Sequence, residues 1–127
     1  MMDARSEANL AEVHPDLCKV IREAAQHASF IVIHGVRTAA EEAANVAKGA
    51  SQTMHSRHLP NHDGFACAVD VAAMNEGHIS WDAGLYTVIN RAVQAAAEEL
   101  NVPIEWGGAW RTLKDWGHFQ LPWGKYP

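Results

Sequence analysis

The sequence predicts an α+β domain in which helices pack on a small, largely antiparallel sheet. Two segments, 15–25 and 82–100, carry apolar residues at the spacing of amphipathic helices. The short apolar runs that are typical of strands lie at 30–33, 66–71, 104–106 and 118–121. These helices and strands do not follow the regular βαβ order of a parallel sheet, which favours the α+β class.

The first two predicted helices have recognisable ends. Pro15 and Asp16 suit the first turn of a helix, because proline has no amide hydrogen to lose there and a carboxylate favours the positive end of the helix dipole. Thr38 and Glu41 form a capping-box pattern that begins an alanine-rich helix, and Gly49 stops it. The strand at 30–33, rich in β-branched residues, lies between these two helices and ends before Gly35.

The second half of the chain contains a polar loop, the longest predicted helix and three strands. Residues 50–64 are rich in turn-forming types and are expected to be a loop. Ser80 or Asp82 caps the helix that follows the 66–71 strand, and Asn101 with Pro103 ends it. The two remaining strands flank a turn that contains a glycine pair.

Composition excludes several classes of protein. A chain of 127 residues with 48% hydrophobic residues forms one domain, 1–127, with a core of its own. The net charge of −5 argues against nucleic-acid binding. No apolar run is long enough to span a membrane, and the polar start lacks the apolar region of a signal peptide. Cys18 and Cys67 form no pattern that predicts a disulfide framework.

Histidine is over-represented, with 8 in the chain, and polar clusters suggest where some of them act. One cluster is 54–58, in the predicted loop. Another is Asp70, a carboxylate within an apolar strand, which is costly to bury unless it is paired or bound to a cation. The last is 115–118, which holds Asp115 and His118 at the start of the final strand. Two histidines and one aspartate can bind zinc and leave a fourth position open, as in catalytic sites. By spacing alone, Asp70 could equally cap a turn and His118 could be a half-buried strand residue.

The order of these motifs resembles a known family. The matching segments are Ser56-Arg57-His58, Ala66-Cys67-Ala68-Val69-Asp70, Glu105-Trp106-Gly107-Gly108 and Asp115-Trp116-Gly117-His118-Phe119-Gln120-Leu121. They resemble the zinc peptidases of the D-alanyl-D-alanine carboxypeptidase type, which share the fold of the hedgehog signalling domain. Within that group the chain is most similar to phage endolysins that cut the L-alanyl-D-glutamate bond of peptidoglycan. Further matches are Gly35-Val36-Arg37-Thr38, Asn9-Leu10 and Val13-His14-Pro15.

The resemblance implies a role for each matching residue. The zinc ligands would be His58, Asp70 and His118, with Asp115 as the catalytic acid and base. Arg37 would bind a substrate carboxylate or the polarised carbonyl oxygen.

The resemblance also gives Ser56 a place in the substrate pocket, and the chain departs from the family pattern beside it. The stretch between the first histidine and Asp70 is longer than usual, with an apparent loop insertion around 59–64, and Ala66 stands where the family has glycine. The insertion makes His62 a rival ligand, although His58 keeps the Ser-x-His context.

The expected function is therefore a zinc-dependent endopeptidase that cuts the stem peptide of peptidoglycan and lyses bacteria. The alternatives are a D,D-carboxypeptidase or dipeptidase of the same family, and a non-catalytic zinc-dependent module that binds cell walls. The resemblance implies synthesis in the host cytoplasm without a signal peptide, release through a holin-type membrane lesion and action in the periplasm. We expect a monomer whose partner is the stem peptide.

Overall fold

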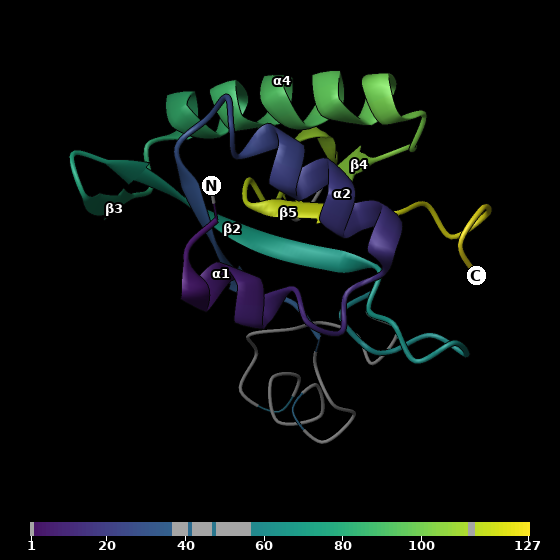
Figure 1. Cartoon of the computed structure of the whole chain (residues 1–127). Coiled ribbons are helices and arrows are strands. Elements are labelled where there is room, and N and C mark those ends of the chain that lie inside the picture. Colours follow the sequence, from purple (N-terminus) through teal and green to yellow (C-terminus); the bar gives the residue numbers. More distant parts are fainter. Residues whose placement is uncertain (1, 37–40, 42–46, 48–56, 112–113) are drawn as a thin grey trace.

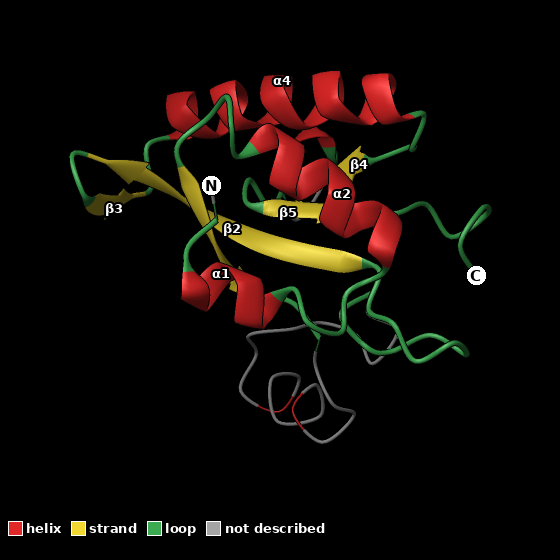
Figure 2. Cartoon of the chain, viewed as in Figure 1, coloured by secondary structure: helices red, strands yellow, loops and turns green. Residues whose placement is uncertain are grey.

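The structure is a computed structural model that describes residues 2–36, 41, 47, 57–111 and 114–127. It confirms the α+β class, with helices packed on a small antiparallel sheet (Figure 2). In chain order the elements are α1 (Ala4–Asn9), α2 (Pro15–Ala24), β1 (Phe30–His34), β2 (Ala68–Asn75), β3 (His78–Ser80), α4 (Ala83–Leu100), β4 (Glu105–Trp106), the 3₁₀ helix η1 (Gly107–Ala109) and β5 (His118–Gln120). None of the helices among these residues has the length and apolar character needed to cross a membrane.

The sheet is built around β2, the longest strand. Its strand order is β1-β2-β5-β4, with β3 paired to the far end of β2, and every one of these pairings is antiparallel. Among the described residues, a parallel bridge between Val13 and Ala66 lies outside the named strands. Because β5 sits beside β2, a strand from the end of the chain lies next to one from its middle.

The hydrophobic core lies on one face of this sheet, under α2 and α4 (Figure 1). Alternate residues of β2, namely Val69, Val71 and Ala73, point into it and are at most 1% exposed. Phe119 of β5 joins them. Since side chains of a strand alternate between faces, the residues between these, including Asp70, point to the opposite face.

The predicted helix ends are confirmed at α2 and α4. His14 caps α2, because its Nδ1 accepts a hydrogen bond from the amide of Asp16 at 3.1 Å. Asp82 caps α4 by accepting from the amide of Gly84 at 2.9 Å. Asn101 ends α4 in the left-handed conformation, with φ of 58°. That conformation costs asparagine less than most residues.

The sequence did not predict helix α1, the 3₁₀ helix η1, strand β3 or the exact bounds of β2. The six-residue helix α1 is too short for a periodic pattern, and it is held by tertiary contacts instead. The Ser6 hydroxyl accepts from the amide of Val32 at 2.9 Å, and the Asn9 side chain donates to the carbonyl of Val32 at 2.8 Å, so α1 covers β1.

The strand predicted at 66–71 is β2, which starts two residues later and ends four residues later, at 68–75. The first two residues of the predicted strand form backbone hydrogen bonds outside the sheet. The amide of Ala66 donates to the carbonyl of Glu12, and the amide of Cys67 donates to the carbonyl of Arg57. The extra length of β2 pairs with β3, a short hairpin strand that the sequence did not reveal. The helix predicted from Thr38 and most of the loop at 50–64 fall outside the described residues.

Candidate metal centre

Two neighbouring strands place a carboxylate and an imidazole side by side. Asp70 of β2 and His118 of β5 are direct partners in the antiparallel register. Both point away from the core, since Val69, Val71 and Phe119 occupy the core face. His118 Nδ1 lies 3.1 Å from Asp70 Oδ1. The sheet itself therefore fixes this pair.

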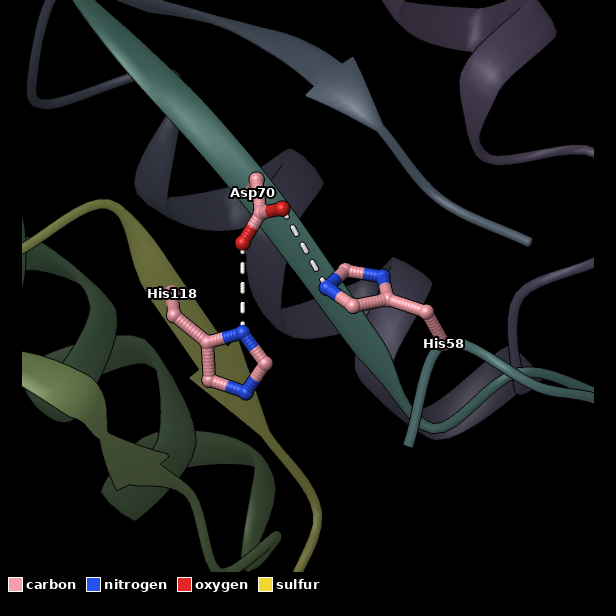
Figure 3. Close-up of side chains that lie close together, drawn as sticks. All are labelled: His58, Asp70 and His118. Carbon is pink, nitrogen blue, oxygen red and sulfur yellow. Dashed lines mark hydrogen bonds and ion pairs between the residues drawn. The ribbon is translucent and has the colours of Figure 1, made fainter. Parts of the chain in front are cut away.

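His58 reaches the same carboxylate from the loop before β2. Its Nε2 lies 3.2 Å from Asp70 Oδ2, and its side chain is 4% exposed. On the other side of the ring, Nδ1 lies 2.8 Å from the carbonyl oxygen of Gly35. Figure 3 shows the resulting arrangement, in which Asp70 lies between the two imidazoles.

The three side chains fit the requirements of a metal ion. One ligand atom from each of His58, Asp70 and His118 lies within 4.8 Å of the others. Both histidines also have an oxygen acceptor at the remaining ring nitrogen, Gly35 for His58 and Gln120 for His118. A proton held at that nitrogen makes the nitrogen that faces Asp70 the one that can give up its own proton to a metal, as metal-binding histidines need. The donor set is thus two nitrogens and one carboxylate.

The charge of Asp70 is stabilised by its neighbours. Burial alone would raise the pKa of this carboxyl, but hydrogen bonds with His118, His34 and His58 hold the pKa well below its usual range. His34 contributes from β1, with its Nδ1 3.4 Å from Asp70 Oδ2. The site therefore presents an anionic carboxylate, which suits cation binding.

Asp115 lies just before the final strand, and backbone hydrogen bonds fix its position. Its amide donates to the carbonyl of Gly107 at 3.1 Å, and its carbonyl accepts from the amide of His118 at 3.2 Å. Partial desolvation raises the pKa of Asp115, and the negative charge of Asp70 raises it further. A carboxylate with a raised pKa is a better proton acceptor, which suits general-base chemistry.

A pocket of about 400 Å³ opens beside this group. Its lining includes the two carboxylates of Asp70 and Asp115 and the side chains of Trp81, Lys114 and Trp116. Trp81 is 69% exposed, so it offers a large apolar surface at the mouth. The pocket therefore offers space for a ligand beside both carboxylates.

The structure separates the predicted site residues into those it brings together and those it does not. His58, Asp70 and His118 form one group, with Asp115 beside the pocket that Asp70 lines. His62, the rival ligand, is exposed and pairs with its neighbour Asp63 instead. Arg37 and Ser56 lie outside the described residues.

Sequence reasoning missed some neighbours of the site. Gln120, which contacts His118, had no assigned role, although the two-residue spacing on one strand places both side chains on one face. Trp110 lies against the His118 ring, with centroids 5.1 Å apart. Arg57 is buried directly before His58 and donates to the backbone carbonyls of Leu121 and Tyr126, which ties the C-terminal segment to this loop. No local pattern predicts the contacts of Trp110 and Arg57.

Comparison with known proteins identifies relatives of this chain. The family model described as phage L-alanyl-D-glutamate peptidase matches residues 1–118. The L-alanyl-D-glutamate peptidase of Escherichia phage T5 is 32% identical over 127 residues, which is 95% of this chain and 88% of that protein.

Two further relatives extend the comparison. The L-alanyl-D-glutamate peptidase of Listeria phage A118 is 31% identical over 96 residues, covering 76% of this chain and 31% of that protein. The crystal structure of the L-Ala D-Glu endopeptidase ChiX from Serratia marcescens superposes with a TM-score of 0.89 at 48% identity, covering 98% of this chain and 91% of that one.

Proposed function

The chain belongs to the family of phage L-alanyl-D-glutamate peptidases, and on that premise we propose that it is a zinc-dependent endopeptidase of the peptidoglycan stem peptide. Its activity is that of an L-alanyl-D-glutamate peptidase acting on peptidoglycan. The observation that carries the zinc proposal is the convergence of His58, Asp70 and His118 from a loop and two strands.

The proposed ligands match the preferences of zinc. Two imidazole nitrogens and one carboxylate oxygen leave one tetrahedral position open, as in catalytic zinc sites. Zinc in such a site supplies Lewis acidity, which polarises a carbonyl and lowers the pKa of water. The hydrogen bonds from the outer ring nitrogens of His58 and His118 hold both rings in the orientation that binding requires.

Asp115 is proposed to move the protons of hydrolysis. Its carboxylate would accept a proton from the attacking water and deliver it to the leaving amine. The raised pKa of Asp115 suits both steps, since a weakly acidic group holds the proton between them. The glycine-rich turn of η1 fixes the backbone of Asp115, so the side chain stays beside the pocket.

The pocket beside Asp115 is proposed to receive the stem peptide. Trp81 and Trp116 provide apolar surface, and Lys114 provides a positive charge that suits the carboxylates of such a peptide. Arg37 and Ser56 are proposed to complete the substrate site, on the strength of their match to the family motifs. The bond cut would be the amide between L-alanine and D-glutamate.

The biological setting is also a proposal. The protein would be made in the host cytoplasm, pass the inner membrane through a holin-type lesion and act as a monomer on the wall in the periplasm, causing lysis. Its net charge of −5 gives no attraction to an anionic outer membrane, which fits attack from within.

Digestion of purified peptidoglycan, with and without a chelator, tests this function. Mass spectrometry should find stem peptides released with a new D-glutamate amino terminus, and the chelator should abolish the release. Loss of a terminal D-alanine alone would instead identify a carboxypeptidase. Unchanged muropeptides together with retention on cell walls would identify a binding module.

A further inference from the structure

A second groove, of about 360 Å³, has no part in the proposed reaction. The indole rings of Trp106 and Trp110 line it together with the carboxylate of Glu105. The side-chain amides of Asn90 and Gln94 line it from α4. We call the groove defined by these five residues the tryptophan groove. Aromatic faces beside a few hydrogen-bonding groups are typical of sites that bind a small ligand.

Aromatic contacts connect the tryptophan groove to the candidate metal centre and to the pocket beside Asp115. The ring of Trp110 lies against the ring of His118, with centroids 5.1 Å apart. Trp106 contacts Trp116, which lines the pocket, with centroids 5.5 Å apart. The indole nitrogen of Trp106 also donates to the carbonyl oxygen of Trp116 at 2.8 Å. Both cavities therefore border the candidate metal centre.

The polar groups of the tryptophan groove can both donate and accept hydrogen bonds. Asn90 and Gln94 lie one turn apart on α4, and Gln94 Nε2 donates to Asn90 Oδ1 at 3.1 Å. An amide has two N–H donors and an oxygen acceptor, so this shared bond leaves the pair able to bind a ligand. Glu105 is exposed, and Gln120 Nε2 donates to its Oε1 at 2.9 Å, which holds the carboxylate at the groove. Hydroxyl and acetamido groups need partners of both kinds.

The charge of the tryptophan groove distinguishes it from the pocket beside Asp115. Among the described residues, the groove lining includes the carboxylate of Glu105 but no lysine or arginine. Lys114 lines the pocket, where a metal ion would add further positive charge. A part of a ligand that carries carboxylates therefore suits the pocket, and a neutral part that carries hydroxyl groups suits the tryptophan groove.

The substrate of an L-alanyl-D-glutamate peptidase has two unlike halves. On the carboxyl side of the bond, D-glutamate and the rest of the stem peptide carry free carboxylates. On the amino side, an amide joins L-alanine to the N-acetylmuramic acid of the glycan strand, so that this half is neutral. Its sugars present apolar C–H faces, which suit stacking on an indole, beside hydroxyl and acetamido groups.

We propose that the tryptophan groove binds the amino sugars of the glycan strand, on the amino side of the bond that is cut. The inference rests on the proposed endopeptidase function and states which part of the substrate the enzyme recognises besides the peptide. Trp110 stacks on a sugar ring, while Asn90 and Gln94 hydrogen-bond its hydroxyl or acetamido groups. Binding energy from such a remote part of the substrate can raise the rate at the reacting bond.

A pair of substrates isolates the contribution of the sugars. One is a disaccharide tetrapeptide, in which N-acetylglucosamine and N-acetylmuramic acid remain joined to L-alanine. The other is the same tetrapeptide with its L-alanine N-acetylated, which keeps the neutral amide but has no sugar. We expect kcat/KM to be about tenfold higher for the substrate with sugars. Because damage to the metal centre lowers both rates, the ratio of the two kcat/KM values measures sugar recognition alone.

Trp110→Ala should abolish most of this preference, and Trp110→Phe, which keeps an aromatic face, should retain part of it. Trp81→Ala is the matched control, because Trp81 is an exposed tryptophan that lines the other pocket. It should lower both rates and leave their ratio unchanged. Asn90→Ala leaves the ring against His118 in place, and it should lower the ratio about threefold through the loss of a hydrogen-bonding group. This variant decides the matter if Trp110→Ala has no activity.

Equal kcat/KM values for the two substrates would overturn the inference, as would a ratio that Trp110→Ala and Asn90→Ala leave unchanged. A ratio that falls in Trp81→Ala instead would place the sugars in the pocket beside Asp115. Failure of the proposed function would look different, because neither substrate would then be cut between L-alanine and D-glutamate. Circular dichroism of each variant confirms that the fold is intact.

Discussion

Asp70 and His118 are direct register partners on β2 and β5, with His118 Nδ1 3.1 Å from Asp70 Oδ1. Backbone hydrogen bonds of the sheet hold the two residues together, so their contact does not depend on a loop. His58 completes the group from the loop before β2, which is not part of the sheet. The candidate metal centre is therefore held mainly by the sheet, and metal binding would need little rearrangement.

Removal of His118 should abolish both metal binding and hydrolysis. The variant His118→Ala takes away one of three proposed ligands and leaves Asp70 without its hydrogen bond from that ring. Elemental analysis of the purified variant should find less than one tenth of the zinc bound to the natural protein. His78→Ala, which changes an exposed histidine on β3, should retain full occupancy and activity. Full zinc occupancy in His118→Ala would exclude it as a ligand.

Asp115→Ala should separate catalysis from metal binding. Asp115 is not among the three proposed ligands, so zinc should stay bound at the natural stoichiometry. Hydrolysis should slow by at least about 100-fold, as expected for loss of a general base. Turnover of purified peptidoglycan, measured beside the exposed-loop variant Asp63→Ala, decides the matter. Near-normal turnover in Asp115→Ala would assign the proton transfer to another residue.

The turn before the final strand should tolerate no side chain at Gly107. A Cβ there would collide with the carbonyl oxygen of Asp115 and crowd the Cβ of His118. We expect Gly107→Ala to lower the free energy of unfolding by about 1–3 kcal/mol, in the range of overpacked sites, and to reduce activity. Gly124→Ala is the control, since nothing lies within 4 Å of a Cβ at that position. Urea denaturation of both variants measures the difference.

The pairing of Asp70 with His118 should give the metal-free protein a stability that depends on pH. Hydrogen bonds hold the pKa of Asp70 well below its usual range despite burial, so its contribution is lost as the pH falls below about 3.9. Burial alone would lower the pKa of His118, but its contact with Asp70 raises it. That contribution is therefore lost as the pH rises above about 6.5.

The contribution of this pair to stability should thus be greatest between about pH 4 and 6.5. Urea unfolding of the metal-free protein at a series of pH values measures it, as the difference between the natural protein and Asp70→Asn. A difference that stays constant from pH 5 to pH 9 would contradict the pairing.

Local sequence patterns predicted the parts of the fold that local forces determine. The apolar period of α2, the Asp82 cap of α4 and the β-branched run of β1 depend on neighbours within a few residues. The resemblance to a known family, rather than spacing, supplied the residues that the structure groups at Asp70. Position 58 was preferred over position 62 because of its motif, and the structure brings His58 to the carboxylate.

The parts that were not predicted depend on contacts between distant segments. Helix α1 is too short to have a clear pattern, and β1 holds it through Ser6 and Asn9. The pairing of Gln120 with Glu105 follows from strand register, which no single strand encodes. The start of β2 likewise depends on the backbone hydrogen bonds of Ala66 with Glu12 and of Cys67 with Arg57.

The alternation of β2 has a consequence for how the gene can vary. Val69 and Val71 pack in the core, whereas Asp70 between them belongs to the candidate metal centre, so neighbouring codons would be under different selection. Polar or smaller residues at Val69 or Val71 would reduce the amount of folded protein. Substitution of Asp70 would instead leave folded protein without activity. Insertion or deletion of one codon would exchange the two faces and damage both properties at once. This strand can therefore change by substitution but not in length.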